Sequence, residues 1–288
     1  RLAPYGGAAL LLWGLVQSRL VESWDLLLYD HTIVTRHHAS AKNQPVTIIG
    51  ISGDDVERYG YPIEDGLLCR AINRASQAGA TAIGLDLYRD KGVGPNQACL
   101  RHLAQHEPKL VTIFNWNEGV EPIPGSRADR RSYNDLVPDP DGVVRRDLVH
   151  VSGQDQATVS FALRLVEVAT GDQRLREQLD HPEQTAASTR WGWLDLANRS
   201  GGYRNMQGEA GGYQRLLPFR QPGSFATLSL SQLLQRPLQA SHNQLAGRIV
   251  LIGTTDPAQR DLLLTPYTRF TSVNKGMEMR TPGVEIHA

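Results

Sequence analysis

A short apolar run near the carboxyl end constrains the fold of this chain more than any other stretch. Residues 249–252 are Ile-Val-Leu-Ile, and Gly253 follows them directly. The run is too short for a helix and is apolar on both faces, so it predicts a buried strand in the middle of a parallel sheet. Gly253 permits a sharp turn after the strand. We therefore expect the next three side chains to lie where the strand end opens into a crevice: Thr254, Thr255 and Asp256.

Two earlier segments have the same character, and a helical pattern separates them. Residues 46–51 form an apolar, β-branched run followed by a polar turn, and residues 82–86 form another that ends in an aspartate. Between them, apolar residues recur at helical spacing over residues 67–78, with Asp65 as a candidate helix cap. A strand, a helix and a strand at this spacing predict a right-handed βαβ unit with parallel strands.

Further strand and helix patterns complete an α/β fold. Residues 110–114 predict a third strand, and residues 97–106, 160–169 and 225–234 predict helices. Strands that alternate with helices favour a mixed, largely parallel central sheet with helices on both faces. Residues 172–212 are polar and rich in glycine, so we expect an irregular insertion there.

Two adjacent arginines follow a tight turn. Residues 139–142 are Asp-Pro-Asp-Gly, which is typical of a turn, and they lead into a strand that carries Arg145 and Arg146. Side chains alternate along a strand, so these two guanidiniums should lie on opposite faces. We expect at most one of them to point into a crevice shared with the aspartates.

The strand ends together predict a ligand site. If the predicted strands are neighbours, Asp54, Asp86 and Asp256 converge at the carboxyl edge of the sheet, where open α/β sheets bind ligands. Close carboxylates repel one another unless a cation, an arginine or shared protons offset their charge. A bound divalent cation with oxygen ligands is one account, an ion-pair network with an arginine is another, and a helix or turn cap at each aspartate is a third. The candidate ligand-binding residues are Asp54, Asp55, Asp86, Arg145, Arg146, Thr254, Thr255, Asp256 and Asp261.

Composition and motifs argue against two classes of function. The chain has 30 Lys and Arg residues against 30 Asp and Glu residues, so it lacks the basic excess of a nucleic-acid-binding protein. We find no nucleophile elbow, P-loop or zinc motif, so we expect that the chain is not an enzyme.

The two cysteines, Cys69 and Cys99, have no metal-binding spacing. An exported protein could pair them, and the sequence does not decide this.

The N-terminal segment permits two interpretations. Residues 3–16 are apolar but fall short of the ~20 residues that a membrane span needs. They could form a core-facing helix or the outer part of a membrane span. We expect residues 1–40 to form an N-terminal helix that is partly the end of such a span, and residues 41–288 to form the domain itself.

Several stretches, in this order, resemble the second type of CHASE domain, the cyclase and histidine-kinase associated sensory extracellular domains of bacterial receptors. The most specific stretches are residues 141–146, Asp-Gly-Val-Val-Arg-Arg, and residues 282–287, Pro-Gly-Val-Glu-Ile-His. The other matching pieces are residues 46–55, 84–86, 160–163 and 247–253, and Asp261 with Thr265-Pro266.

The resemblance implies an extracytoplasmic sensory domain of a transmembrane receptor. Its expected place is the periplasmic side of the cell membrane, joined by flanking helices to a cytoplasmic output such as a nucleotide cyclase, a diguanylate cyclase or a histidine kinase. We expect an unidentified small-molecule or ionic stimulus and a homodimer, without a nucleic-acid partner. Two other functions stay open: a metal-dependent hydrolase that uses the aspartate cluster, and a dimerisation domain without a ligand.

Overall fold

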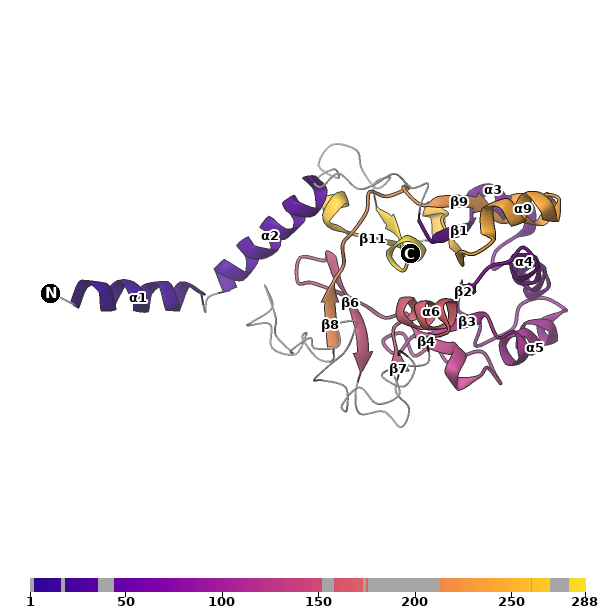
Figure 1. Ribbon diagram of the computed structural model, residues 1–288, viewed down its shortest axis with the longest axis horizontal. Coiled ribbons are helices and arrows are strands. Elements are labelled where there is room, and N and C mark those ends of the chain that lie inside the picture. Colours follow the sequence, from indigo (N-terminus) through magenta and orange to yellow (C-terminus); the bar gives the residue numbers. More distant parts are fainter. Residues whose placement is uncertain are drawn as a thin grey trace.

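The computed structural model describes most of the chain. The described residues are 3–16, 19–35, 44–151, 158–172, 175, 213–259, 261–269 and 280–288. The expected insertion at residues 172–212 lies largely outside these ranges. Figure 1 shows a layered α/β body from which the N-terminal helices extend on one side.

Within the described residues, six strands form one central sheet in the order β4-β3-β2-β10-β1-β9, and every neighbouring pair is parallel. Strand β10 lies between β1 and β2, with Ile252 opposite Ile49 and Leu85. The predicted buried middle strand and the largely parallel sheet are therefore confirmed. The strands are β1 Val46–Ile51, β2 Ala82–Asp86, β3 Leu110–Phe114, β4 Arg131–Tyr133, β9 Ala226–Ser229 and β10 Ile249–Thr254.

Helices cover both faces of this sheet (Figure 1). On one face, Leu68, Leu100 and Leu233 share a core with Ile49 and with further strand residues. The helices there are α3 Gly53–Tyr59, α4 Asp65–Gln77, α5 Gln97–His106, α8 Leu230–Gln235 and α9 Leu238–Leu245. On the other face, α6 Phe161–Thr170 and α11 Gly283–Ile286 pack through Phe161, Leu165 and Val284. The predicted two-sided cover of helices is confirmed.

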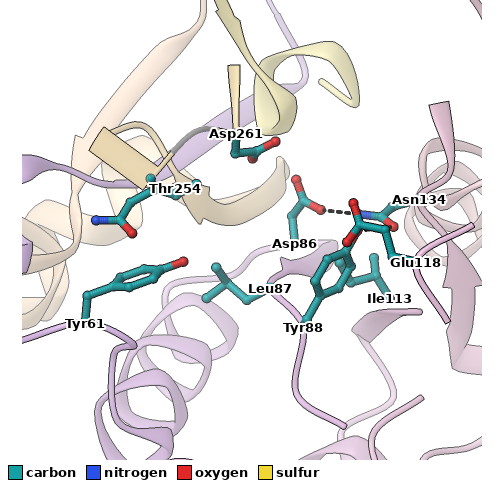
Figure 2. Close-up of a pocket in the computed structure, with 10 residues that line it drawn as sticks. Tyr61, Asp86, Leu87, Tyr88, Ile113, Glu118, Asn134, Thr254 and Asp261 are labelled. Atoms are coloured by element: carbon teal, nitrogen blue, oxygen red, sulfur yellow. Dashed lines mark hydrogen bonds between the residues drawn. The ribbon is translucent and has the colours of Figure 1, made fainter. Parts of the chain in front are cut away.

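The carboxyl ends of the parallel strands meet at one edge of the sheet. Asp86 is the last residue of β2, and Thr254 is the last residue of β10. In register, Gly253 of β10 lies opposite Asp86. Figure 2 shows Asp86 and Thr254 on either side of the space at this edge.

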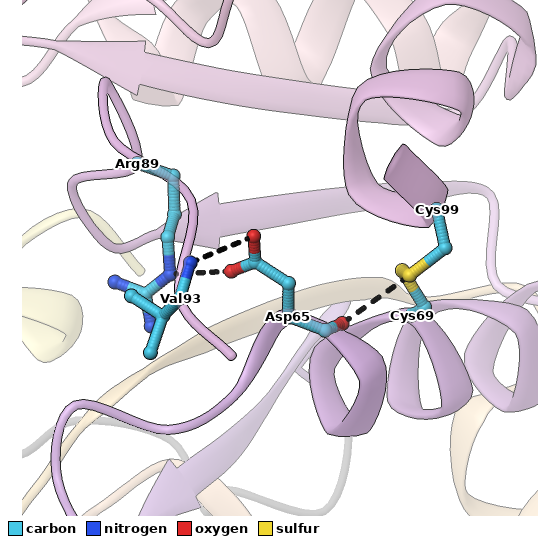
Figure 3. Close-up of a disulfide and its surroundings, with 5 residues drawn as sticks. All are labelled: Asp65, Cys69, Arg89, Val93 and Cys99. Carbon is cyan, nitrogen blue, oxygen red and sulfur yellow. Dashed lines mark hydrogen bonds and ion pairs between the residues drawn. A yellow bond between two sulfur atoms is a disulfide. The ribbon is translucent and has the colours of Figure 1, made fainter. Parts of the chain in front are cut away.

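A disulfide links α4 to α5 on one face of the sheet (Figure 3). It joins Cys69 to Cys99, a pairing that the sequence left open. Asp65 lies nearby but does not cap α4 through its side chain, so that expectation is wrong. Its carboxylate instead accepts hydrogen bonds from Arg89 Nε at 3.2 Å and from the Val93 amide at 3.1 Å. The buried guanidinium competes for this carboxylate more strongly than the neutral amides of the first turn.

The predicted helix at residues 225–234 is only half correct. Residues 226–229 form the edge strand β9, and the helix begins at Leu230. Ser229 stops the strand and caps the helix, because its hydroxyl accepts a hydrogen bond from the Gln232 amide at 3.1 Å while the Gln232 side chain accepts one from the Ser229 amide. This reciprocal capping box fixes the boundary.

A second, antiparallel sheet lies beyond α6. Its long strand β6 pairs with β5, β7 and β8, and it carries the two adjacent arginines. Its strands are β5 Leu136–Pro138, β6 Val144–Val151, β7 Thr158–Val159 and β8 Tyr213–Leu216. The remaining short elements are the 3-10 turns η2 Ala128–Arg130 and η5 Pro257–Gln259 and the pair β11 Leu262–Leu263 and β12 Thr281–Pro282.

Two helices precede the body, α1 Ala3–Val16 and α2 Arg19–Thr35. The last turns of α2 pack on the second sheet, where Ile33 is buried with Val144, Phe219, Tyr267 and Ile286. Helix α1 extends away from the body, and its side chains from residue 9 to residue 15 are exposed, so it does not face the core. Across the described ranges, no helix combines the length and the apolar character required to cross a bilayer.

Candidate functional site

A pocket of about 290 Å³ opens at the carboxyl edge of the central sheet (Figure 2). Its apolar lining is Leu87 and Ile113, both buried. Its polar lining is Tyr61, Asp86, Tyr88, Glu118, Asn134, Thr254, Gln259 and Asp261. The position is the one at which parallel α/β sheets bind their ligands.

Each contributing strand places a polar group at the same edge. Asp86 ends β2, Thr254 ends β10, Glu118 lies in the loop after β3, and Asn134 follows β4 directly. Gly253 allows these groups to approach one another. A Cβ atom on Gly253 would lie 2.8 Å from the Val284 side chain and 3.3 Å from the Asp86 Cβ.

Asp86 is the most buried acid of the pocket, with 7 % of its surface exposed. Burial raises the pKa of its carboxyl to about 6, although the Asn134 amide donates a hydrogen bond to Oδ1 at 3.3 Å and opposes the shift. Burial also raises the pKa of Asp261 to about 6, and the nearby charge of Asp86 adds to the shift. Two carboxyls with raised pKa values thus share one partly desolvated space.

Thr254 brings a hydrogen-bonding group that the chain itself does not use. Its side chain is 5 % exposed, and its Oγ1 has no hydrogen-bond partner among the described residues. A buried hydroxyl without a partner costs about 1–3 kcal/mol, so such groups are rare. Thr254 lines the pocket, but its Oγ1 atom is itself buried and is not exposed to the open space.

Behind the pocket, His287 lies between two acids of different elements. Burial lowers the pKa of His287, while the charges of Asp147 and Asp261 oppose that change. Its ring packs edge-on against Phe161 of α6, with ring centroids 5.5 Å apart. Burial raises the pKa of Asp147, which accepts a hydrogen bond from the Ser160 hydroxyl at 2.8 Å. His287 is therefore mainly neutral at pH 7 and gives Asp261 no full countercharge.

The structure does not bring Asp54 and Asp55 into the pocket. Asp54 is exposed in the first turn of α3. Asp55 is buried and accepts hydrogen bonds from the backbone amides of Leu230 at 3.2 Å and Ser231 at 2.9 Å. Burial acts to raise the pKa of Asp55, but hydrogen bonds from Ser52 and Ser231 outweigh it and lower the pKa. Asp55 thus holds the start of α8 against α3, the capping role considered as the third account.

Thr255 and Asp256 also make local contacts outside the pocket lining. The Thr255 amide donates to the Ile51 carbonyl at 3.0 Å. Asp256 accepts from the Ala258 amide at 3.0 Å and from Gln259 Nε2 at 3.2 Å, and so stabilises the turn η5. In the described parts of the chain, no group of three or more His, Cys, Asp or Glu side chains could hold a metal ion. The predicted three-aspartate cluster is therefore not formed.

Arg145 and Arg146 are buried residues of β6 in the second sheet, and they do not line the pocket. Arg145 forms ion pairs with Asp30 at 2.7 Å, Asp139 at 2.6 Å and Asp141 at 2.7 Å. Arg146 also reaches Asp139, at 3.1 Å. We expect the alternation along the strand to separate the two arginines. It does not, because both long side chains reach the carboxylate of Asp139 in the turn before β6.

Sequence reasoning missed the apolar lining residues Leu87 and Ile113 and five polar ones, namely Tyr61, Tyr88, Glu118, Asn134 and Gln259. Two of the polar residues had a usable signal. Tyr88 follows Asp86 by two residues, the spacing that continues one face of a strand. Asn134 ends a strand in the same way as Asp86, but β4 has only three residues and was not recognised. The other three polar residues lie in loops, whose course depends on tertiary packing.

Comparison with known proteins gives one match. A family model, the CHASE2 domain, matches residues 7–288, which is nearly the whole chain. No curated protein and no solved structure shows significant similarity to it. CHASE2 domains are non-catalytic sensory extracellular domains of signalling receptors. With the match extending over both the central sheet and the second sheet, this chain belongs to the CHASE2 domain family.

Proposed function

We propose that this chain is the extracytoplasmic sensor of a bacterial transmembrane receptor and that it detects a small molecule in the pocket between β2 and β10. The signal passes to a cytoplasmic nucleotide cyclase, diguanylate cyclase or histidine kinase. The observation that carries the proposal is the pocket itself, where the buried Thr254 hydroxyl has no partner among the described residues and Asp86 is held in a desolvated position.

The disulfide supports the extracytoplasmic location. Cys69 and Cys99 are bonded between α4 and α5 (Figure 3). Structural disulfides persist in oxidising compartments such as the periplasm and are rare in the cytosol. A domain on the periplasmic side of the membrane would keep this bond.

A continuous set of contacts leads from the pocket to α2. The Gly283 amide donates to the Asp261 carbonyl at 3.1 Å, and a Cβ on Gly283 would lie 2.5 Å from Asp261 Oδ1. Gly283 begins α11, whose Ile286 shares a buried cluster with Ile33 of α2. A ligand that moves Asp261 therefore acts on α11 directly and on α2 through the buried cluster that contains Ile286 and Ile33.

Such a path suits signalling by a shift of populations. A ligand needs only a different affinity for two arrangements of the domain, and no bond has to be made or broken. Helix α2 is held to the domain by buried contacts at its carboxyl end, so a displacement there would be passed along the helix as a rigid unit.

The exposed apolar residues of the N-terminal helices support a further contact surface. Leu12 and Trp13 of α1 and Trp24 and Leu28 of α2 have exposed fractions between 63 % and 70 %. Burial of such side chains in a homodimer or at a membrane surface would be favourable. The proposal therefore includes a homodimer whose packing along these helices changes when the pocket is filled.

The test is thermal melting of the 288-residue chain against a panel of metabolites of positive, negative and zero charge, with Mg²⁺ and Ca²⁺ included. The pocket variant is Asp86→Asn, and the matched control is Asp54→Asn, which removes an equal charge from an exposed site. A saturable rise in Tm that only Asp86→Asn abolishes is expected. Hydrogen exchange in the presence of the same compound should then slow in α11 and α2.

Two results would contradict the proposed function. If no compound or ion in the panel raises Tm, the pocket is not a ligand site. If a compound binds in the pocket but leaves hydrogen exchange in α11 and α2 unchanged, binding is not transmitted along the path.

A further inference from the structure

The negative charges of the pocket carboxylates have no positively charged side chain beside them in the pocket lining, among the described residues. Elsewhere in the described chain, several buried carboxylates face guanidiniums: Asp30 and Asp139 bind Arg145, Asp65 binds Arg89, and Glu167 binds Arg164. Buried Asp55 and Asp135 instead accept hydrogen bonds from backbone amides. The pocket contains three carboxyl groups, from Asp86, Asp261 and Glu118. Its lining, taken over the described residues, includes no lysine, arginine or histidine.

The hydrogen-bonding groups of the pocket are mainly acceptors. Asp86 and Asp261 are acceptors when ionised, and Glu118 adds a third carboxylate. The complementary group is a donor that carries a positive charge and several N–H bonds. A primary ammonium has three N–H donors and no acceptor. A metal ion is a weaker match, because the described residues include no group of three His, Cys, Asp or Glu side chains placed to hold one.

The walls suit the carbon part of such a compound. Leu87 and Ile113 are apolar, and the rings of Tyr61 and Tyr88 add aromatic surface, which attracts cations as well as alkyl groups. In Figure 2 these side chains lie on the side of the pocket opposite Asp261. The volume of about 290 Å³ is at the lower end of the range of about 300–1,000 Å³ for small-molecule sites.

We infer that the stimulus is a small aliphatic amine whose primary ammonium group binds between Asp86 and Asp261, with its carbon chain against Leu87 and Ile113. This inference rests on the proposed sensory function and specifies its ligand class. Glu118 is exposed at the rim, where it can bind a second ammonium group of a diamine.

The ionisation of the two acids agrees with this assignment. The carboxyls of Asp86 and Asp261 have pKa values raised to about 6, so both are largely ionised at pH 7.5 and largely protonated at pH 5. The other titratable groups around them are Tyr88, Glu118 and the mainly neutral His287. An ammonium ligand should therefore bind more tightly at pH 7.5 than at pH 5.

The experiment uses four compounds with the same four-carbon skeleton. 1,4-Diaminobutane carries two ammonium groups, 4-amino-1-butanol carries one, and 1,4-butanediol carries none. Succinate carries two carboxylates and no ammonium group. Binding to the 288-residue chain is measured by titration calorimetry at constant ionic strength. The two amines should bind saturably, and the diol and the diacid should not. Asp86→Asn and Asp261→Asn should each weaken amine binding by tenfold or more, while Asp54→Asn should leave it unchanged.

Several outcomes would overturn the inference, and they are distinct from failure of the proposed function. Equal binding of the amines and the diol, or tighter binding of succinate, excludes a cationic ligand. Amine binding that survives in Asp86→Asn places the amine outside the pocket. Absence of amine binding up to 10 mM, on the order of the Kd of a very weak site, excludes small amines as the ligand class. If the wider panel then yields another compound that depends on Asp86, the sensory function stands and only the ligand class is wrong.

Discussion

Asp30 of α2 and Arg145 of β6 form a two-point ion pair in which neither side chain is exposed. Arg145 Nε lies 2.7 Å from Asp30 Oδ1, and Arg145 Nη2 lies 2.8 Å from Asp30 Oδ2. Burial acts to lower the pKa of Arg145, but its hydrogen bonds to Asp30, Asp141 and Asp139 outweigh burial and raise the pKa. Arg145 therefore stays charged, and its contact with Asp30 fixes α2 to the second sheet.

Asp30→Ala should lower the free energy of unfolding by about 3–5 kcal/mol, because it leaves a buried guanidinium without one of its partners. Urea denaturation of the whole chain measures this change. The control is Asp25→Ala on the same helix, where the side chain is exposed and the expected change stays within about 0.5 kcal/mol. Equal effects of the two substitutions would show that α2 is not held by this pair.

Asp86 should make the domain less stable as the pH rises. Its pKa is raised from 3.8 to about 6 in the folded state, so the folded protein holds this proton more tightly than the unfolded chain. Stability contributed by the protonated form is present near pH 4 and is lost as the pH rises through 6. A shift of roughly two units corresponds to about 3 kcal/mol.

Asp86→Asn should remove this dependence. The neutral amide mimics the protonated acid, so the variant should match the wild type near pH 4 and exceed its stability by about 2–3 kcal/mol at pH 7.5. Urea denaturation at both pH values measures the difference in stability between the variant and the wild type. Other acids such as Asp55 and Asp141 are present in both proteins, so their contributions cancel. A variant that is less stable than the wild type at pH 7.5 would contradict the raised pKa. The same variant should lose ligand binding, so stability and function oppose each other at this residue.

The central sheet could be predicted from the sequence because strands buried on both faces are apolar throughout. Residues 46–51, 82–86, 110–114 and 249–252 have this composition and correspond to β1, β2, β3 and β10. The edge strands could not be predicted in the same way. Strand β9 has four residues of mixed polarity, and its pattern also suits the helix that follows it.

The candidate site could be predicted only where a residue directly follows a strand. Asp86 and Thr254 satisfy this condition, and they line the pocket together with Asp261. The partners of the other candidates are remote in sequence and cannot be deduced from spacing. Asp55 is separated by 176 residues from Ser231, and Arg145 by 115 residues from Asp30. Sequence shows that an aspartate or arginine is present, but the packing of distant elements decides whether it binds a ligand or another side chain.

Removal of the disulfide should lower stability without changing the pocket. The bond between Cys69 and Cys99 closes a loop with a sequence separation of 30, for which loop entropy predicts a loss of about 3–4 kcal/mol. The variant Cys69→Ala with Cys99→Ala avoids free thiols, and urea denaturation measures the loss. Ligand affinity of the folded variant should stay unchanged, because neither cysteine lines the pocket. A large loss of affinity would instead assign α4 and α5 a part in the site.

Gly253→Ala tests the connection between the pocket and α11. The added Cβ would lie 2.8 Å from Val284 Cβ and Cγ2, so α11 must move or the strand must shift. Overpacking of this kind costs about 1–3 kcal/mol. We expect the variant to bind the ligand of the pocket but to show a reduced change in hydrogen exchange in α11 and α2.

Gly84→Ala is the matched control, because it overpacks the same face of the sheet away from the pocket. Its Cβ would lie 2.6 Å from Phe161 Cζ and 2.7 Å from Leu251 Cδ2. This control should lose stability to a similar extent and keep the full response in α11. Combining Gly253→Ala with Val284→Ala removes the contacted Cγ2 atom but keeps Cβ, and it should restore part of the response. If the double variant stays unresponsive while Gly84→Ala responds normally, Gly253 acts on the pocket through Asp86 rather than on the path through α11.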